Sequence, residues 1–394
     1  MKNDYFEFCN SVKIMCGRFA LENMPHELEN LGVKKPLVLT NDFLVKIGLV
    51  KTALTPLEQA GMTGYPIYDQ IPADSSVNVV NDAAKVFREQ ECDGMIAIGG
   101  GSVLDTAKGV GMVISQNSQD LLAFMGSEML TRGQRVPYFA IPTTAGTGSE
   151  STLVAVIANQ EQHVKMEFIS YNLLPDVAVI DPRMTASLPP KMTAATGMDA
   201  LSHAIEAYTC IQRNPLSSAY ATAAIEMIGQ NLKRVVEDGK DEEARLNMAL
   251  ASTMAGAAFS NSMVGLVHAI GHACGGIAHV AHGEAMSILL PYCMAYNMDT
   301  IGYLYGKLLL PLAGEQVYLE TPKEERGMKF LMTVRDMAKE FHEMCGLPIT
   351  LSQAGVREDQ LTPISHGALN DGAILYNPKE IHEDEVLALL QQAF

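Results

Sequence analysis

The sequence predicts an α/β domain followed by an all-helical domain. In the first half, short apolar β-like runs alternate with helical stretches, which is typical of a parallel sheet covered by helices. From about Lys191 onward, long helical patterns rich in Ala, Leu and Met dominate. We place the boundary near Leu188 to Pro190, which gives domains over residues 1–188 and 189–394. No Ser/Gly linker separates them, so we expect direct packing and an interdomain cleft, where ligand sites are common.

Short apolar runs that end at turn residues predict the strands of the first domain. These runs cover residues 35–42, 94–100, 135–144 and 176–182. A further strand is expected within 57–71, after a helix end and a glycine break. Helical periodicity over 79–93 leads directly into the run at 94–100.

The second half contains long helical patterns that few β-branched runs interrupt. The clearest of these patterns cover residues 217–238, 242–262 and 383–394. An all-helical domain is therefore expected there.

Composition restricts the partners and the location of the protein. Hydrophobic residues make up 48% of the 394 residues, and a net charge of −17 without basic runs argues against a nucleic-acid partner. The N-terminus does not resemble a signal peptide, and no run reaches the roughly 18 apolar residues that span a bilayer. The seven cysteines are scattered without a CxxC pair, as in a reducing compartment. We expect a cytoplasmic enzyme without a membrane partner.

A group of histidines in the second half predicts a metal site. Asp199 and His203 stand four residues apart, as do His268 and His272, and His282 follows ten residues later. Residues at i and i+4 share one face of a helix. Three imidazoles and one carboxylate suit Fe²⁺, Zn²⁺, Ni²⁺ or Co²⁺, so we predict that Asp199, His203, His268 and His282 bind one ion. The alternative to metal binding is a structural role, which is the usual one for a single histidine pair on an apolar helix.

A glycine-rich turn follows the strand expected at 94–100. Adjacent glycines allow backbone N–H groups to approach an anion, and the N-terminus of the following helix adds positive potential. The turn does not match the GxGxxG fingerprint, and a tight strand–helix connection is the alternative interpretation. The residues concerned are Gly99, Gly100, Gly101, Ser102 and, within the helix, Asp105.

A second polar loop follows the strand expected at 135–144. Its hydroxyl groups belong to Thr143, Thr144, Thr147 and Ser149. Two polar loops at the ends of neighbouring parallel strands are typical of a ligand at the carboxyl edge of a sheet. The alternative is a polar connection without a ligand.

Five motifs in this order carry a resemblance to a known family. They are GGGS-x-x-D-x-A-K, PTTAGTGSE, LLPDVAVIDP, GMDALSHAIEAY and GLVHAIGHACGGIAHVAHGEAMSILLP. From about Leu37 to its C-terminus, the chain resembles the iron-dependent (group III) alcohol dehydrogenases. The resemblance implies a dinucleotide-binding α/β domain, an all-helical domain and a metal in the cleft between them. It also implies a homo-oligomer, a dimer or a larger assembly.

The resemblance assigns roles to individual residues. Asp199, His203, His268 and His282 match the family's metal ligands, in agreement with the spacing argument. His272 matches a position beside the nicotinamide that is not usually a ligand and that could relay a proton.

The remaining matches concern the cofactor and the substrate. The GGGS glycines, Ser102 and Asp105 would hold the pyrophosphate, and the three threonines of the second loop would line the cofactor. Lys165 matches a lysine that reaches the ribose region, and Phe259 matches an aromatic residue that bounds the substrate pocket.

Two positions depart from the family pattern. Asn41 stands where an Asp often accepts a hydrogen bond from the ribose 2′-OH of NAD and repels the 2′-phosphate of NADP. The cofactor is therefore NAD(H), with NADP(H) left open. Residues 71–77 replace a Pro-Asn-Pro-Thr segment, so the contacts of that segment are not carried over.

The implied function is interconversion of a small primary alcohol or diol and its aldehyde by hydride transfer. Iron is the expected metal, and the same ligands suit zinc. A dehydroquinate-synthase-like cyclase, a hydroxyacid-oxoacid transhydrogenase and a non-catalytic cofactor-binding role are the alternatives. The few arginines of the helical half favour a small neutral substrate. Glu206, seven residues after Asp199, is expected to be solvated or to cap a helix rather than to support a ligand.

Overall fold

The computed structural model describes residues 5–124, 130–131, 133–160 and 164–394. These residues form two compact units. The α/β unit covers 9–187, and the helical unit covers 188–394 together with the described residues before Cys9. Among the latter, the ring of Phe8 lies 5.5 Å from that of Tyr220. Whether the units are independent domains with the expected boundary stays a prediction.

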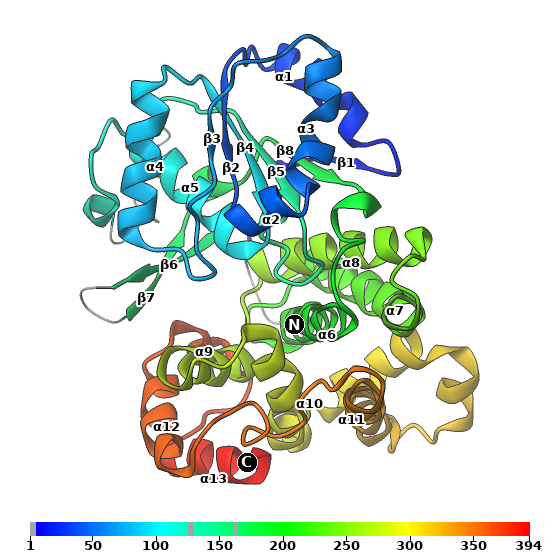
Figure 1. The fold of residues 1–394 in the computed structure, drawn as a ribbon. Coiled ribbons are helices and arrows are strands. Elements are labelled where there is room, and N and C mark those ends of the chain that lie inside the picture. The colour runs from blue at the N-terminus through cyan, green and yellow to red at the C-terminus, as the bar shows by residue number, and fades with distance from the viewer. Residues whose placement is uncertain (1–4, 125–129, 132, 161–163) are drawn as a thin grey trace. The chain divides into compact units, whose positions relative to one another are not determined.

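The α/β unit is built on a six-stranded sheet in which every pairing is parallel. Figure 1 shows the twisted sheet with helices on its two faces. In sheet order the strands are β1 (Lys13–Cys16), β8 (Val177–Ile180), β5 (Tyr138–Pro142), β4 (Gly94–Gly99), β2 (Pro36–Leu39) and β3 (Ile67–Tyr68). All the strands expected from apolar runs are present. Strand β1 is not among the expected strands, because this short edge strand is only partly buried and lacks a continuous apolar run.

Each face of the sheet packs against its own helices because successive side chains of a strand point to opposite sides. Leu37 and Leu39 belong to the core that contains α4 (Val77–Glu89) and α5 (Gly101–Ser115). Val38 belongs to the opposite core. The helices near that core are α1 (Met24–Asn30), α2 (Asp42–Lys46) and α3 (Leu49–Gln59).

An antiparallel pair, β6 (Val154–Asn159) and β7 (Val164–Ile169), stands apart from the main sheet. Neither strand is among those expected from the sequence. Buried and half-buried residues alternate along β6, and Ala155 and Ile157 pack into the core beside α5. Such alternation is typical of a strand with one covered face, unlike the continuous apolar runs of the parallel strands.

The helical unit contains eight α-helices in the described part of the chain. They are α6 (Pro190–Thr209), α7 (Pro215–Glu237), α8 (Glu242–Ser260), α9 (Leu266–Ala278), α10 (His282–Glu320), α11 (Arg326–Cys345), α12 (Leu361–Leu369) and α13 (Glu383–Ala393). The three expected helical patterns correspond to α7, α8 and α13.

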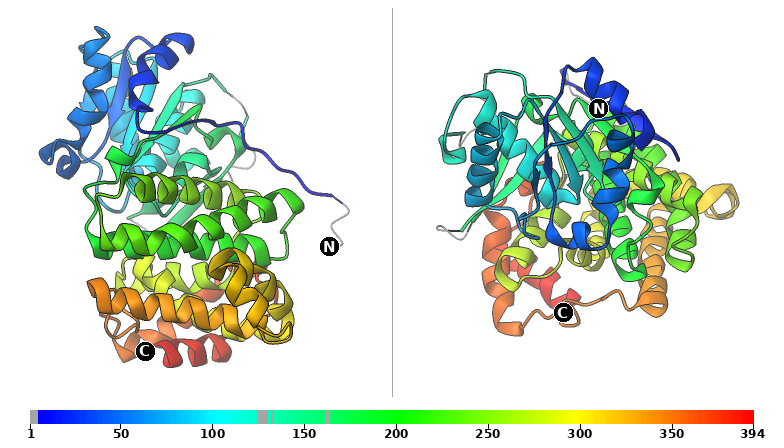
Figure 2. Two further views of the ribbon diagram at one scale, coloured as in Figure 1. Left: turned by 90° about the vertical axis from the view of Figure 1, so that its right-hand side faces the viewer. Right: turned by 45° about the horizontal axis from the view of Figure 1, so that its top comes forward.

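Helix α6 is central to this unit. It is buried along most of its length and packs against α7, α8 and α10. Figure 2 shows the green helices α6 to α8 running alongside one another. A break at Gly314, with a φ of 83°, divides the long α10. None of the helices described combines the length and the apolar character that crossing a bilayer requires.

Candidate metal centre

Four side chains of the helical unit converge on one point. Asp199 and His203 come from α6, His268 from α9, and His282 is the first residue of α10. One ligand atom from each lies within 4.8 Å of the others. Asp199 Oδ1 lies 3.7 Å from His203 Nδ1, 3.9 Å from His268 Nε2 and 3.3 Å from His282 Nε2. Three imidazoles therefore surround one carboxylate oxygen.

The convergence depends on close helix packing. The four-residue spacing places Asp199 and His203 on one face of α6. A Cβ atom at Gly283 would lie only 2.6 Å from the carbonyl oxygen of Ala195 in α6. Glycine at this position therefore lets the first turn of α10 contact the α6 backbone, which brings His282 beside Asp199.

The donor atoms of the group fit a bound cation. Asp199 Oδ1, His203 Nδ1 and His268 Nε2 are buried, and no hydrogen-bond partner for them is present among the described residues. Buried polar atoms without partners are rare and costly, so a ligand is expected to satisfy them. A tetrahedral ion with bonds of roughly 2.0–2.1 Å separates its donors by about 3.3 Å. The Asp199 distances of 3.3–3.9 Å are close to that value.

Burial keeps the histidines in the form that binds metal. It lowers the pKa of His203 to about 3 and holds the pKa of His268 well below its usual range. Both rings are therefore neutral at pH 7 and have a free lone pair. Burial raises the pKa of Asp199, but its interactions with the surrounding imidazoles lower it by more, so this carboxylate is ionised at pH 7. The side chain of His282 is 39% exposed and lies at the open side of the group.

Of the two roles expected for Glu206, the solvated one is wrong, whereas capping of a helix is confirmed at the start of α9. Its side chain is only 8% exposed, and Oε2 lies 2.5 Å from Nδ1 of His268. Oε1 accepts a hydrogen bond of 2.7 Å from the backbone N–H of Val267 in the first turn of α9. Burial raises the pKa of Glu206 to about 7. Its spacing from Asp199 indicated the correct face of α6, but only the packing of α9 shows that this face is buried.

His272 lies one helical turn beyond His268 on α9 and has its own acidic partner. Its Nδ1 lies 2.8 Å from Asp371 Oδ2, and Asp371 Oδ1 accepts a hydrogen bond from the backbone N–H of Ala373. Sequence reasoning missed Asp371, because 99 residues separate it from His272 and no local pattern marks it. Phe259 lies on the other side of the group, with its ring stacked 4.3 Å from that of His203.

The two polar loops of the α/β unit are neighbours, as their places after adjacent strands require. Gly99 ends β4, and its carbonyl oxygen accepts a 3.0 Å hydrogen bond from the N–H of Thr143, just after β5. A Cβ atom at Gly101 would lie 3.0 Å from Thr147 Cγ2. Thr144 also lies close to the turn, since a Cβ atom at Gly100 would be 3.3 Å from its Cγ2.

Buried polar contacts join these loops. Asp105 accepts hydrogen bonds from Ser149 Oγ at 2.7 Å and from the N–H of Val156 at 3.0 Å. The ammonium group of Lys108 donates to Ser149 Oγ at 2.9 Å and also contacts the start of β6. Ser102 Oγ donates to the carbonyl oxygen of Ala73. Asp105 and Ser149 thus contact each other within the α/β unit.

The remaining predicted residues of this unit have separate partners. Asn41 is the N-cap of α2, where its Oδ1 accepts a 2.9 Å hydrogen bond from the N–H of Leu44. Lys165 lies on β7, and its ammonium group contacts Asp74 at 2.9 Å. Asp74 belongs to the 71–77 segment that departs from the family pattern.

Comparison with known proteins agrees with the fold and with the buried Asp/His group. Residues 11–182 match the family described as iron-containing alcohol dehydrogenase, and residues 193–394 match the Fe-containing alcohol dehydrogenase family, C-terminal. A 1,3-propanediol dehydrogenase of Klebsiella pneumoniae is 36% identical over 96% of each chain. An NAD-dependent methanol dehydrogenase of Bacillus methanolicus is 34% identical over 96% of this chain and 97% of its own.

Solved structures agree as well. A 1,3-propanediol oxidoreductase superposes with a TM-score of 0.93 at 34% identity, covering 99% of this chain and 100% of its own. A parallel α/β sheet and an all-helical unit with a buried Asp/His group define a metal-binding oxidoreductase. The chain belongs to the iron-containing alcohol dehydrogenase family.

Proposed function

We propose that this protein is a metal-dependent, NAD(P)-linked oxidoreductase that interconverts a small primary alcohol or diol and its aldehyde. The observation that carries the proposal is the convergence of buried, unpartnered donor atoms of Asp199, His203 and His268 beside His282. The names of the methanol and propanediol dehydrogenases among its relatives support a small alcohol or diol as substrate.

Asp199, His203, His268 and His282 would hold the metal, with Fe²⁺ as the proposed ion and Zn²⁺ as a second ion that these ligands suit. When bound, such a metal supplies Lewis-acid polarisation of the alcohol or aldehyde oxygen. The stacked ring of Phe259 restricts the orientation of the His203 imidazole and bounds the proposed substrate pocket.

His272 would move the proton that the reaction releases or consumes. If Asp371 accepts the proton on Nδ1 of His272, Nε2 is the ring nitrogen that would exchange a proton with the substrate or with water. Asp371 also caps the turn at Ala373, which restricts its own rotation and therefore that of the imidazole.

The glycine turn after β4 and the threonine loop after β5 would bind the pyrophosphate of the dinucleotide. Backbone N–H groups at the start of α5 and the positive end of this helix suit a phosphate. The nicotinamide of NAD(P) supplies the hydride acceptor or donor. Lys165 and Asn41 would contact the ribose region, whereas Asp105 would mainly hold the two loops together.

The test is oxidation of NADH and of NADPH with a panel of short aldehydes. Protein stripped of metal is measured before and after addition of Fe²⁺ under anaerobic conditions, with Zn²⁺ in a parallel sample. We expect Fe²⁺ to restore turnover. Absence of turnover with every aldehyde, despite bound metal and cofactor, would instead favour the cyclase or the transhydrogenase.

A matched pair of variants tests the ligand assignment. His282→Ala removes a partly exposed member of the group, so we expect the fold to persist while metal binding and turnover are lost. His366→Ala removes a histidine that is 72% exposed on α12 and should leave both unchanged. Full metal content and activity in the His282 variant would contradict the assignment.

A further inference from the structure

Glu206 has contacts that bear on the orientation of His268. One carboxylate oxygen lies 2.5 Å from His268 Nδ1, and the other accepts the N–H of Val267 at 2.7 Å. Because Oε1 already accepts the N–H of Val267, Oε2 is the oxygen that faces His268 Nδ1 as an acceptor. With the ring proton held on Nδ1 in this way, the lone pair of Nε2 would face Asp199.

We propose that Glu206 is a positioning residue that holds His268 in its metal-binding tautomer and docks the start of α9 on α6. The inference rests on the proposed metal centre. Asp199, His203 and Glu206 follow the i, i+4, i+7 spacing, so one face of α6 carries two candidate ligands and the group that orients a third. Such partners of metal-bound histidines typically change metal affinity when they are mutated.

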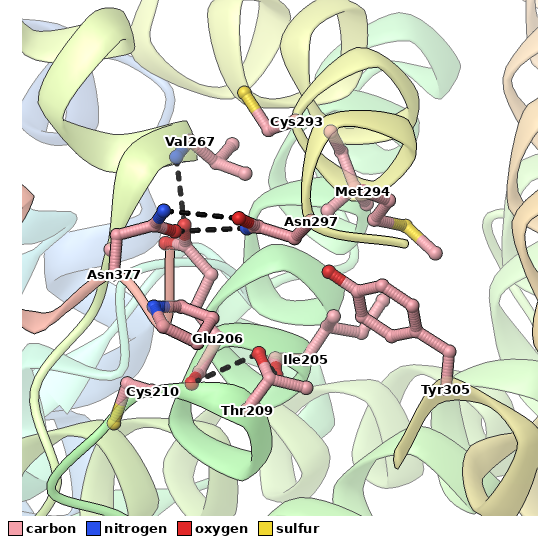
Figure 3. A pocket seen from close by; sticks show the side chains of 13 residues that line it. Ile205, Glu206, Thr209, Cys210, Val267, Cys293, Met294, Asn297, Tyr305 and Asn377 are labelled. Atoms are coloured by element: carbon pink, nitrogen blue, oxygen red, sulfur yellow. Dashed lines mark hydrogen bonds between the residues drawn. The ribbon is translucent and has the colours of Figure 1, made fainter. Parts of the chain in front are cut away.

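The surroundings of Glu206 favour this arrangement. Figure 3 shows Glu206 among the residues that line a small pocket, where its carboxylate points toward Val267. Two amides that line the same pocket, Asn297 and Asn377, donate to each other at 2.9 and 3.0 Å. A Cβ atom at Gly265 would lie 3.3 Å from Glu206 Oε1, so glycine leaves room for the carboxylate at the start of α9.

Glu206→Gln tests the proposal because glutamine has nearly the same shape but only one acceptor oxygen. If that oxygen keeps the hydrogen bond from Val267, the amide NH₂ faces His268 Nδ1 and forces the ring proton onto Nε2. The cap of α9 is retained, so we expect a folded protein whose Zn²⁺ affinity falls by about 10- to 100-fold.

Thr209→Val is the matched control. Thr209 lines the same pocket, and its hydroxyl donates at 2.8 Å to the carbonyl oxygen of Ile205 in its own helix. Because this hydroxyl does not contact His268, the Zn²⁺ affinity of the variant should stay within about twofold of the original.

Two measurements decide the outcome. Competition with a chromophoric chelator gives Zn²⁺ affinity without turnover, and ¹⁵N NMR of labelled histidines gives the tautomer of His268 in metal-free protein. A proton on Nδ1 in the original protein and on Nε2 in Glu206→Gln, with weakened Zn²⁺ binding, supports the proposal. Unchanged affinity in this variant, or a proton on Nε2 in the original protein, overturns it.

The proposed function fails separately from this inference. If the original protein binds no Zn²⁺ or Fe²⁺, the metal centre is refuted, whereas the tautomer of His268 can still be measured. If Glu206→Gln does not fold, the tautomer of His268 in the original protein tests the proposal by itself. An Nδ1 without a proton would exclude the positioning role of Glu206.

Discussion

Replacement of Lys108 by Met should strongly destabilise the α/β unit. The Lys108 side chain is fully buried, and its ammonium group donates to Ser149 Oγ, Thr152 Oγ1 and the carbonyl oxygen of Val154 at 2.7–2.9 Å. It also lies 3.9 Å from Asp105 Oδ1. Methionine has a similar length, so the variant removes the charge and the donors without leaving a large cavity.

The expected loss of unfolding free energy follows from the buried groups that Lys108→Met leaves without a partner. Removing one member of a buried ion pair typically costs about 3–5 kcal/mol, because the other charge stays buried without compensation. We therefore expect Lys108→Met to lose about 4 kcal/mol of unfolding free energy. For a unit of this size the loss corresponds to a Tm lower by roughly 8–16 °C.

The assay is urea unfolding followed by circular dichroism, since the chain has no Trp for fluorescence. Lys85→Met is the control, because Lys85 is 71% exposed and its contact with Glu89 is 3.8 Å. It should change stability by less than about 0.5 kcal/mol. The double variant Lys108→Met with Asp105→Asn should lose less unfolding free energy than the two single variants lose in total. The difference should exceed about 1 kcal/mol. A loss below about 1 kcal/mol in Lys108→Met, or additive effects, would refute the reasoning.

Three further outcomes are expected. Burial lowers the pKa of Lys108 to about 8 from 10.5, so the unfolded chain binds more protons between these values. The stability gap between the original protein and Lys108→Met should therefore widen by about 2 kcal/mol from about pH 7 to about pH 9.5, and a constant gap would contradict this. Asn41→Asp should retain the cap of α2 and raise the ratio of kcat/KM for NADH over NADPH by about tenfold, whereas an unchanged ratio would place the ribose elsewhere. Asp371→Asn should lower kcat by about tenfold or more, because its NH₂ would face Nδ1 of His272, while Zn²⁺ affinity stays unchanged; an unaffected kcat would contradict the proton relay.

The fold class could be predicted because its signals are local. Continuous apolar runs predicted β2, β4, β5 and β8, and helical periodicity predicted α7, α8 and α13. Three strands, β1, β6 and β7, were missed. Charged side chains interrupt β1 and β7, so no continuous apolar run marks them. Strand β6 does lie in an apolar run, residues 153–158, but this run was not among the expected strands.

The candidate metal group could also be predicted, since the spacing of Asp199 and His203 is a property of the helix itself. The partners of the histidines could not. Glu206 contacts His268 across 62 residues and Asp371 contacts His272 across 99, so neither pair has a sequence pattern.

By itself, the sequence determined the alternation of strands and helices in the first half, the helical character of the second half, and the residue types available for metal and phosphate binding. These depend on periodicity and on side-chain chemistry. Only the tertiary structure decided that Asp199, His203, His268 and His282 meet, and which carboxylate orients each imidazole of α9. The physical reason is close packing: the approach of α10 to α6 at Gly283 and the contact of α9 with Glu206 depend on surfaces that are distant in sequence.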